Sequence, residues 1–285
     1  MVKRSFRLVD LTYQLASRPN QVLTLGHFAE KYQTAKSSIS EDLAIMKAVL
    51  EGQGHGRLQT MTGAAGGVRF EPAMTLDAAR KWTDEVCRKL SDPERVLPGG
   101  YLYMSDLFGD PEFVFALGRL LATGFARSGA EVVMTIEMKG IPLAYALAYY
   151  LHLPVVVVRR DQQIVEGSFV SINYVSGSRR QVQTMSLPRR SLTEGARVLI
   201  VDDFMKAGGT LHGMLGLLKE FRAEPAGIAV FVESANAGVR LVKDYVSVAR
   251  LEGIDEQSGS VRVVPGNLLE QMSDAFVESD RTESE

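Results

Sequence analysis

The stretch from Val198 to Thr210 places two acids directly after a short apolar run and shortly before a pair of glycines. The apolar run is typical of a buried strand, and ligands of open α/β sheets bind beyond the carboxyl ends of the strands. We therefore expect the strand to end where Asp202 and Asp203 meet a ligand. Two adjacent carboxylates can accept hydrogen bonds from the 2′- and 3′-hydroxyls of a ribose, so the pair favours a sugar ligand.

The loop after these acids has the composition of a phosphate site. Gly208 and Gly209 allow the backbone to approach a ligand closely. The free amides of the following helix, together with the hydroxyl of Thr210, can hold a phosphate dianion. Lys206 adds a positive charge to the loop, whereas Ala207 offers no hydroxyl. The stretch predicts a site for a phosphorylated sugar; the alternative is an ordinary strand-loop-helix unit with surface acids.

From residue 100 onward, short apolar runs alternate with helical stretches. Strands are expected over 132–136, 155–159, 197–201 and 226–232, and helices over 142–151 and 210–221. This alternation predicts an α/β fold with a mainly parallel sheet that carries helices on both faces. Two alternating segments, 168–175 and 181–187, flank residues 176–180 and predict a protruding hairpin with a mobile tip.

The first 74 residues show a different pattern. Apolar spacing predicts helices over 6–18 and 25–32, the second capped by Thr24, and a third that starts at Ser37 with a Ser38–Glu41 capping box and ends at Gly52. Strands over 57–61 and 68–70, joined by a glycine-rich turn, follow. Three helices and a hairpin predict a winged helix-turn-helix domain.

A helical stretch over 76–90 leads from this domain into the second part of the chain. We therefore expect two domains, the winged helix-turn-helix domain over residues 1–74 and the α/β domain over 75–285. The tail from about residue 278 contains almost no apolar side chains and is expected to be disordered.

Composition narrows the possible classes of protein. The 285 residues are 46% hydrophobic and 23% charged, as in a soluble two-domain protein. No apolar run reaches the roughly 20 residues of a membrane span, and the N-terminus lacks a secretion signal, so a cytoplasmic protein is expected. The single cysteine, Cys87, excludes an intramolecular disulfide and a thiolate-rich metal site, and we expect it to be buried on a helix.

Positive charge is concentrated at one end of the chain. Residues 1–74 hold nine Lys and Arg against six Asp and Glu, a net charge of +3, which leaves −5 for the remainder of a chain whose total is −2. This asymmetry suits a domain that contacts a polyanion such as DNA, although solvated basic surfaces are also common.

The stretch 198–210 resembles the phosphoribosyl pyrophosphate (PRPP) signature of type I phosphoribosyltransferases, and 134–142 is similar to that family's pyrophosphate loop. The resemblance implies this fold for the second domain, with Lys139 and the amides around Gly140 at the two phosphates on ribose C1. Arg159 matches a basic residue that faces the pyrophosphate, or is a simple surface arginine. Enzymes of the family mostly have small residues where Lys206 and Ala207 stand here, a departure that suggests binding without turnover.

The whole chain resembles the purine operon repressors of Gram-positive bacteria, with similar segments over 35–43, 93–101 and 171–178. The resemblance implies a homodimer that represses purine synthesis and transport genes and leaves double-stranded operator DNA when PRPP is abundant. It implies no catalytic residue and no required cofactor. A guanine nucleotide bearing pyrophosphates would compete for the same pocket. The need for Mg²⁺ is left open, because PRPP commonly carries the ion without strong protein ligands.

The predicted effector-binding residues come from the two loops and from an aromatic pair, Tyr101 and Phe204, that the resemblance places beside the ligand. They are Tyr101, Lys139, Gly140, Arg159, Asp202, Asp203, Phe204, Lys206, Ala207, Gly208, Gly209 and Thr210. No metal-ligating residue is predicted.

The predicted DNA-binding residues lie at the start of the third helix and among the basic side chains of the first domain. They are Lys3, Arg4, Arg7, Lys36, Ser37, Ser38, Ser40, Arg57 and Arg69. Ser38 could instead only cap the helix, and each basic residue could instead be a solvated charge.

Two other functions stay open at this point. A purine phosphoribosyltransferase with an accessory N-terminal domain would need a segment that recognises a purine, and none of the aromatic or acidic side chains of residues 235–264 can be assigned to that role. A purely architectural DNA-binding protein would leave the acid and glycine stretch without purpose. We therefore expect a repressor and not an enzyme.

Overall fold

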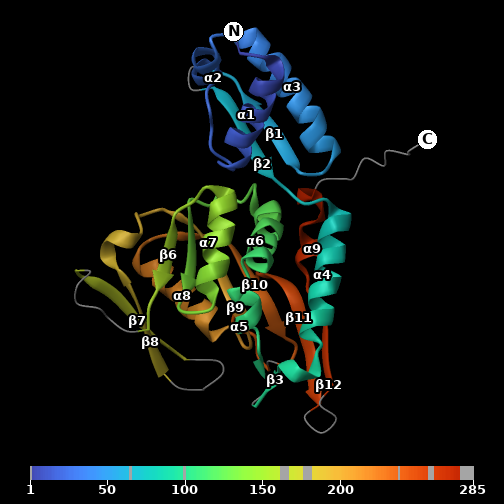
Figure 1. The fold of residues 1–285 in the computed structure, drawn as a ribbon. Coiled ribbons are helices and arrows are strands. Elements are labelled where there is room, and N and C mark those ends of the chain that lie inside the picture. The colour runs from blue at the N-terminus through green and yellow to red at the C-terminus, as the bar shows by residue number, and fades with distance from the viewer. Residues whose placement is uncertain are drawn as a thin grey trace.

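The computed structural model describes residues 2–63, 66–98, 101–160, 167–175, 182–236, 238–255 and 260–276. They form a small N-terminal head that sits on one end of a larger α/β body (Figure 1). The predictions of a mobile hairpin tip at 176–180 and of a disordered tail from about 278 lie outside the described residues.

The head consists of three helices and a two-stranded hairpin, as predicted. They are α1 (Arg4–Ala16), α2 (Leu25–Tyr32), α3 (Lys36–Gly52), β1 (Gly56–Met61) and β2 (Gly67–Pro72). Leu11, Leu15 and Phe28 are fully buried between the helices. The Thr24 hydroxyl accepts a hydrogen bond from the amide of His27 at 3.2 Å, which confirms the predicted cap of α2.

The start of α3 differs from the prediction. Ala35, with an extended backbone, is the N-terminal cap, and no side chain caps the helix. Ser38 already lies within the first helical turn, so the predicted capping box with Glu41 is wrong. Ser40 donates its hydroxyl to the carbonyl of Lys36 at 3.1 Å. Entry into the helix is therefore set by the extended backbone before Lys36 and not by a serine side chain.

The body is built on a six-stranded sheet with the order β12-β11-β10-β9-β5-β6. Its strands are β5 (Val132–Ile136), β6 (Val155–Val158), β9 (Arg197–Met205), β10 (Glu224–Ser234), β11 (Val246–Asp255) and β12 (Ser260–Pro265). Neighbouring strands are parallel except at the β11–β12 edge. The prediction of a mainly parallel sheet is confirmed.

Successive side chains of the strands point to opposite faces of the sheet, and both faces are covered. On one face, residues such as Val133 and Leu199 pack against the helices α4 (Leu76–Leu90), α6 (Pro111–Phe125) and α7 (Gly140–Leu151). Residues such as Met134 and Ile200 on the other face pack against α8 (Gly209–Glu220) and the hairpin of β7 (Phe169–Val175) and β8 (Val182–Pro188).

Smaller elements complete the body. They are β3 (Val96–Leu97), β4 (Tyr101–Leu102), α5 (Ser105–Gly109) and α9 (Leu268–Gln271). Cys87 is buried on α4, as expected. Among the helices that the structure describes, none combines the length and apolar character needed to cross a membrane.

The head contacts the body through α6 and α7, whose ends lie directly beneath it (Figure 1). Arg119 of α6 donates Nη2 to the carbonyl of His55 at 2.8 Å and to the carbonyl of Ala73. Asn20 of the head donates Nδ2 to the carbonyl of Tyr150, at the end of α7, at 2.6 Å. Because β2 ends at Pro72 and α4 begins at Leu76, the predicted boundary near residue 74 falls in the connection between them.

Candidate functional site

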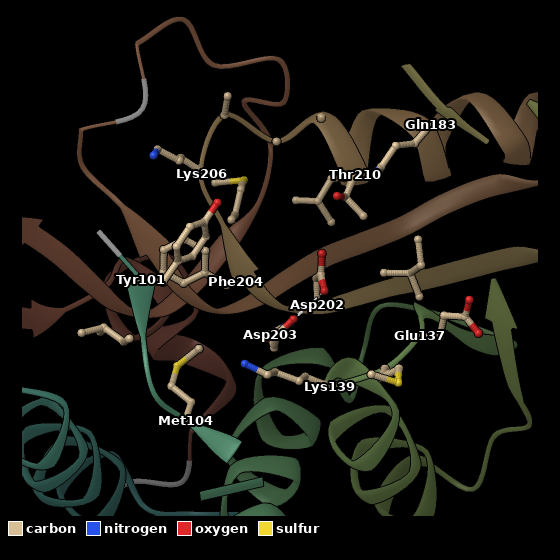
Figure 2. Close-up of a pocket in the computed structure, with 18 of the residues that line it drawn as sticks. Tyr101, Met104, Glu137, Lys139, Gln183, Asp202, Asp203, Phe204, Lys206 and Thr210 are labelled. Atoms are coloured by element: carbon tan, nitrogen blue, oxygen red, sulfur yellow. Dashed lines mark hydrogen bonds between the residues drawn. The ribbon is translucent and has the colours of Figure 1, made fainter. Parts of the chain in front are cut away.

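A cleft of about 510 Å³ opens at the carboxyl end of the central strands β5 and β9. Its walls come from five parts of the body: the β3–β4 hairpin with Met104 after it, the loop between β5 and α7, Arg160 after β6, the end of β9 with the loop before α8, and one side chain of β8. Figure 2 shows Asp202 and Asp203 between Thr210 on one side and Lys139 on the other. Segments that are far apart in the sequence thus meet around the two acids.

The acids lie within strand β9, which continues to Met205, so the expectation that the strand ends at Asp202 is wrong. The strand stays regular there because β10 pairs with it as far as the position opposite Met205. On the other side, pairing with β5 ends at Ile200. Beyond Ile200 this edge of β9 is free of β5, which leaves the acids open to the cleft.

The two carboxyls differ in their surroundings. Asp202 is 5% exposed, and Oδ1 accepts the amide of Asp203 at 2.9 Å. Burial, and then the neighbouring charge of Asp203, raise the pKa of Asp202 well above its usual value. Asp203 is half-buried. Two adjacent carboxyls can each accept a hydrogen bond from one of two vicinal hydroxyls.

The loop that is predicted to bind a phosphate, residues 206–208, joins β9 to α8 and is called the phosphate loop below. Gly208 is the N-terminal cap of α8 and has φ of 83°, in the left-handed region that favours glycine. No side chain caps the helix, so its first amides are available to an anion. Lys206, Gly209 and Thr210 line the cleft at this end.

The loop before α7 forms the other end of the cleft, and like the Lys206 end it carries a cationic side chain. Lys139 lines the cleft and is exposed. Gly140 begins α7 behind it, where a Cβ atom would come within 2.2 Å of the Thr135 hydroxyl. Only glycine lets α7 start this close to β5. The loop therefore places an ammonium group and the start of a helix at the opposite end of the cleft from α8.

Arg159 is not among the cleft residues. Its backbone forms a bridge with Ser186 of β8, with N–O distances of 3.0 and 2.8 Å. Arg160, one position further, lines the cleft, and its amide donates to Glu137 Oε1 at 2.7 Å. The basic residue nearest the acids along this segment is thus Arg160, which the sequence reasoning missed.

An aromatic wall closes the cleft on the side of the β3–β4 hairpin (Figure 2). The rings of Tyr101 and Phe204 are 6.2 Å apart, and the Lys206 ammonium lies 5.8 Å from the centre of the Tyr101 ring. Met104 and Gln183 also face the cleft. Neither residue belongs to a sequence motif, so the sequence alone does not indicate that the fold brings them to the site.

Ten of the twelve predicted effector residues therefore line one cleft, Gly140 packs behind it and Arg159 lies outside its lining. Their roles in binding stay predictions. No group of three His, Cys, Asp or Glu side chains that could hold a metal ion occurs within the described residues.

The predicted DNA-binding residues divide into exposed and engaged side chains. Lys3, Lys36, Ser37 and Ser40 are exposed, and Ser38 is half-buried. Arg4 is exposed but pairs with Asp42 at 2.9 Å.

Three arginines have other partners. Arg7 is 7% exposed and bonds Asp42 at 2.8 Å, so it lies inside the head, and this burial corrects its prediction as a surface contact. Arg69 pairs with Glu71 at 2.6 Å. Arg57 donates to the carbonyl of Ala275 at 3.2 Å and so faces the body. Of the predicted basic residues, Lys3 and Lys36 are therefore the exposed ones that the structure does not place in an ion pair within the described residues.

Two family models match the chain. The model described as "Bacterial purine repressor, N-terminal" matches residues 3–72, and the model described as "Phosphoribosyl transferase domain" matches residues 106–264. The first falls on the head and the second on the sheet that carries the cleft.

Relatives of known name are similar over almost the whole chain. The purine biosynthesis transcriptional repressor PurR of Bacillus subtilis (strain 168) is 49% identical over 282 residues, 99% of either chain. The purine biosynthesis transcriptional activator PurR of Lactococcus lactis subsp. lactis (strain IL1403) is 45% identical over 94% of this chain and 99% of its own. Among solved structures, adenine phosphoribosyltransferase from Thermoanaerobacter pseudethanolicus matches 57% of this chain and 96% of its own with a TM-score of 0.51; at 19% identity this match shows the fold alone.

Proposed function

The chain belongs to the family of purine biosynthesis transcriptional regulators, and from this premise we propose that it is a DNA-binding repressor of purine synthesis and transport genes that PRPP releases from DNA. The observation that carries the proposal is one cleft that holds an acid pair between Lys139 and Lys206, in the same chain as a head that matches the bacterial purine repressor N-terminal domain. The relatives that cover the full chain are named as regulators and not as enzymes, in accord with this role.

The order of groups in the cleft fits the order of groups in PRPP. The start of α8 with Thr210 suits the 5′-phosphate, Asp202 and Asp203 suit the ribose hydroxyls, and Lys139 at the start of α7 suits the pyrophosphate (Figure 2). A guanine nucleotide with pyrophosphate groups would compete at the same two cationic ends.

Any Mg²⁺ would enter with the effector. The described residues hold no cluster of metal ligands, and Mg²⁺ characteristically binds substrate phosphates and water with few carboxylates. Asp203 and Glu137 are half-buried carboxylates of the cleft that such an ion could approach.

Helix α7 offers a physical route from the cleft to the head. Its first residue, Gly140, follows the Lys139 loop, and near its last turn the carbonyl of Tyr150 accepts from Asn20 of the head. Its 12 residues span about 18 Å. An effector that shifts the start of α7 would also move the end of α7 that contacts the head, since a helix transmits displacement along its axis. We propose that this shift favours a head arrangement in the homodimer that no longer fits double-stranded control DNA.

Whether the chain represses or activates is a separate question, because one relative is named a repressor and another an activator. We propose repression because the repressor shares 49% identity and the activator 45%. A reporter gene under a purine-synthesis promoter tests this choice: deletion of the chain's gene should raise expression.

The test of the proposed function is a DNA-binding titration with and without PRPP. The protein should bind control DNA of purine genes tightly without effector and more weakly when millimolar PRPP is present. Unchanged binding at saturating PRPP would refute the coupling. Rapid consumption of PRPP with a free purine base would instead support the alternative of an active phosphoribosyltransferase.

A further inference from the structure

Behind the phosphate loop, a buried acid at the end of β10 gathers three donors. Glu233 is 6% exposed. Its Oε2 accepts from Arg240 Nη2 and from the Tyr245 hydroxyl, both at 2.6 Å, and its Oε1 accepts from the Ser247 hydroxyl at 2.9 Å. Burial, and then the bond to Glu233, raise the pKa of Tyr245 to about 12, so this hydroxyl stays a donor. Both oxygens of the carboxylate are thus occupied by fixed partners.

This cluster holds Arg240 in one orientation. Besides its bond to Glu233, Nη2 donates to the carbonyl of Ser234 at 2.8 Å, and the guanidinium lies 5.7 Å from the centre of the Tyr245 ring. Planar guanidinium groups bonded at several nitrogens lose little further freedom when another bond forms. Arg240 Nη1 can therefore bond the phosphate loop with little further loss of side-chain conformational entropy.

Two consecutive carbonyls of the phosphate loop are held from this side. Arg240 Nη1 donates to the carbonyl of Lys206 at 2.9 Å, and the amide of Leu241 donates to the carbonyl of Ala207 at 3.0 Å. The next residue, Val242, is buried and lies about as close to Gly208 as van der Waals contact allows: its amide nitrogen would be 3.5 Å from a Cβ at Gly208. The segment 240–242 thus backs the whole turn, although none of its residues lines the cleft.

The orientation of these carbonyls decides where the loop amides point. In a planar trans peptide the N–H is directed opposite to the C=O. A Lys206 carbonyl turned outward to Arg240 therefore turns the amide of Ala207 the other way, and an Ala207 carbonyl turned to Leu241 does the same for the amide of Gly208. Either carbonyl turned inward would instead place negative charge beside a bound phosphate.

We propose that Arg240, fixed by Glu233, is a positioning residue that holds the Lys206–Ala207 turn with its amides toward the 5′-phosphate of the effector. It acts through the loop and does not touch the ligand. The inference rests on the proposed function, because it concerns the same phosphate site.

The experiment compares two ligands on four variants of the full chain by calorimetry. PRPP and ribose 5-phosphate share the 5′-phosphate, but only PRPP carries the pyrophosphate. Arg240→Gln should weaken both ligands by the same factor, about tenfold, because a hydrogen bond from a charged donor is worth about 1.5 kcal/mol or more. Lys139→Gln should weaken PRPP and leave ribose 5-phosphate within about twofold of the unchanged protein.

Two further variants separate positioning from general stability. Arg127→Gln makes the same change at an exposed site after α6 and should alter neither affinity. Tyr245→Phe removes one bond to Glu233 but keeps the Arg240 bonds, so it should lower the melting temperature without weakening either ligand. Should Arg240→Gln fail to fold, Glu233→Gln takes its place, with a weaker loss in the same direction expected for both ligands.

The results distinguish the two proposals. Equal losses of PRPP and ribose 5-phosphate in Arg240→Gln, with DNA binding in the absence of ligand unchanged, support the positioning role. Affinities within about twofold of the unchanged protein for both ligands, or a loss for PRPP alone, overturn it while leaving the proposed function in place. If the unchanged protein binds neither ligand, the proposed function and this inference fall together.

Discussion

The contact of Arg119 with the head is the feature whose removal best tests how the cleft and the DNA-binding surface communicate. Replacement of Arg119 by Met keeps most of the length and apolar area of the side chain and removes its donors. The carbonyl of Ala73 would lose its bond from Nη2, as would that of Gly54 at 3.5 Å, and the carbonyl of His55 would keep its bond from the amide of Ala73 at 3.3 Å. The cleft itself would be untouched, because Arg119 does not line it.

The free energy that Arg119→Met removes from the contact is similar in size to the free energy that typically couples two binding sites. Bonds from a charged donor contribute about 1.5–3 kcal/mol each, and of the three the bond to the carbonyl of His55 has an ordinary length, 2.8 Å. Burial opposes this gain, since it is the main cause of the lowered pKa of Arg119. We expect Arg119→Met to cost about 2 kcal/mol of the free energy of contact between head and body, here called the joint. The free energy that couples two binding sites is typically about 1–3 kcal/mol. The contact free energy lost at the joint would therefore be as large as the whole coupling free energy between the cleft and the DNA-binding surface.

The assay is the ratio of DNA affinities with and without saturating PRPP. For Arg119→Met this ratio should fall close to one, while the affinity for PRPP, measured by calorimetry without DNA, stays within about twofold. Arg88→Met, at an exposed position of α4, is the matched control and should keep the full ratio. Because binding couplings are reciprocal, DNA should also cease to weaken PRPP binding. A variant that keeps both the normal ratio and the reciprocal effect would refute the role of this joint.

Three further predictions concern the acids and the head. Asp203→Ala should keep DNA binding and lose the PRPP response in a gel shift, since the ribose anchor is gone while the head is intact; a normal response would exclude Asp203 as the anchor. Asp202→Asn should raise the melting temperature, and the increase should grow as pH rises above about 4. The pKa of Asp202 is raised in the folded state, so ionisation of this carboxyl destabilises the fold. The contribution of Asp202 to stability is therefore full below its unfolded pKa and is lost as pH rises through its folded pKa. A pH-independent difference between the two proteins would contradict this. Lys36→Gln should lower the slope of log K against log salt for DNA by about 0.9 without affecting PRPP affinity, and an unchanged slope would remove Lys36 from the DNA contacts.

Features set by local chemistry were predictable from the sequence. The bounds of α2 and α4 agree with the prediction, because each has a threonine cap and an amphipathic stripe that act within a few residues. The phosphate loop was recognisable for the same reason: its glycines, its lysine and the helix start are contiguous in the chain.

Features set by distant partners were not predictable. β9 extends through the acids because β10 pairs alongside, and the sequence of β9 carries no sign of that pairing. Arg7 is buried because Asp42, 35 residues away, comes to meet it. In the same way, Arg160 and not Arg159 reaches the cleft because β8 takes the backbone of Arg159 into a bridge.

The central claim is that the cleft binds PRPP as a signal and does not consume it, and phosphorus NMR of PRPP with the purified protein tests this most directly. The PRPP resonances should shift or broaden on binding, and the spectrum should show intact PRPP after prolonged incubation with adenine, guanine, hypoxanthine or xanthine and Mg²⁺. Resonances that do not respond to the protein, or the growth of a free pyrophosphate signal at an enzyme-like rate, would contradict the account.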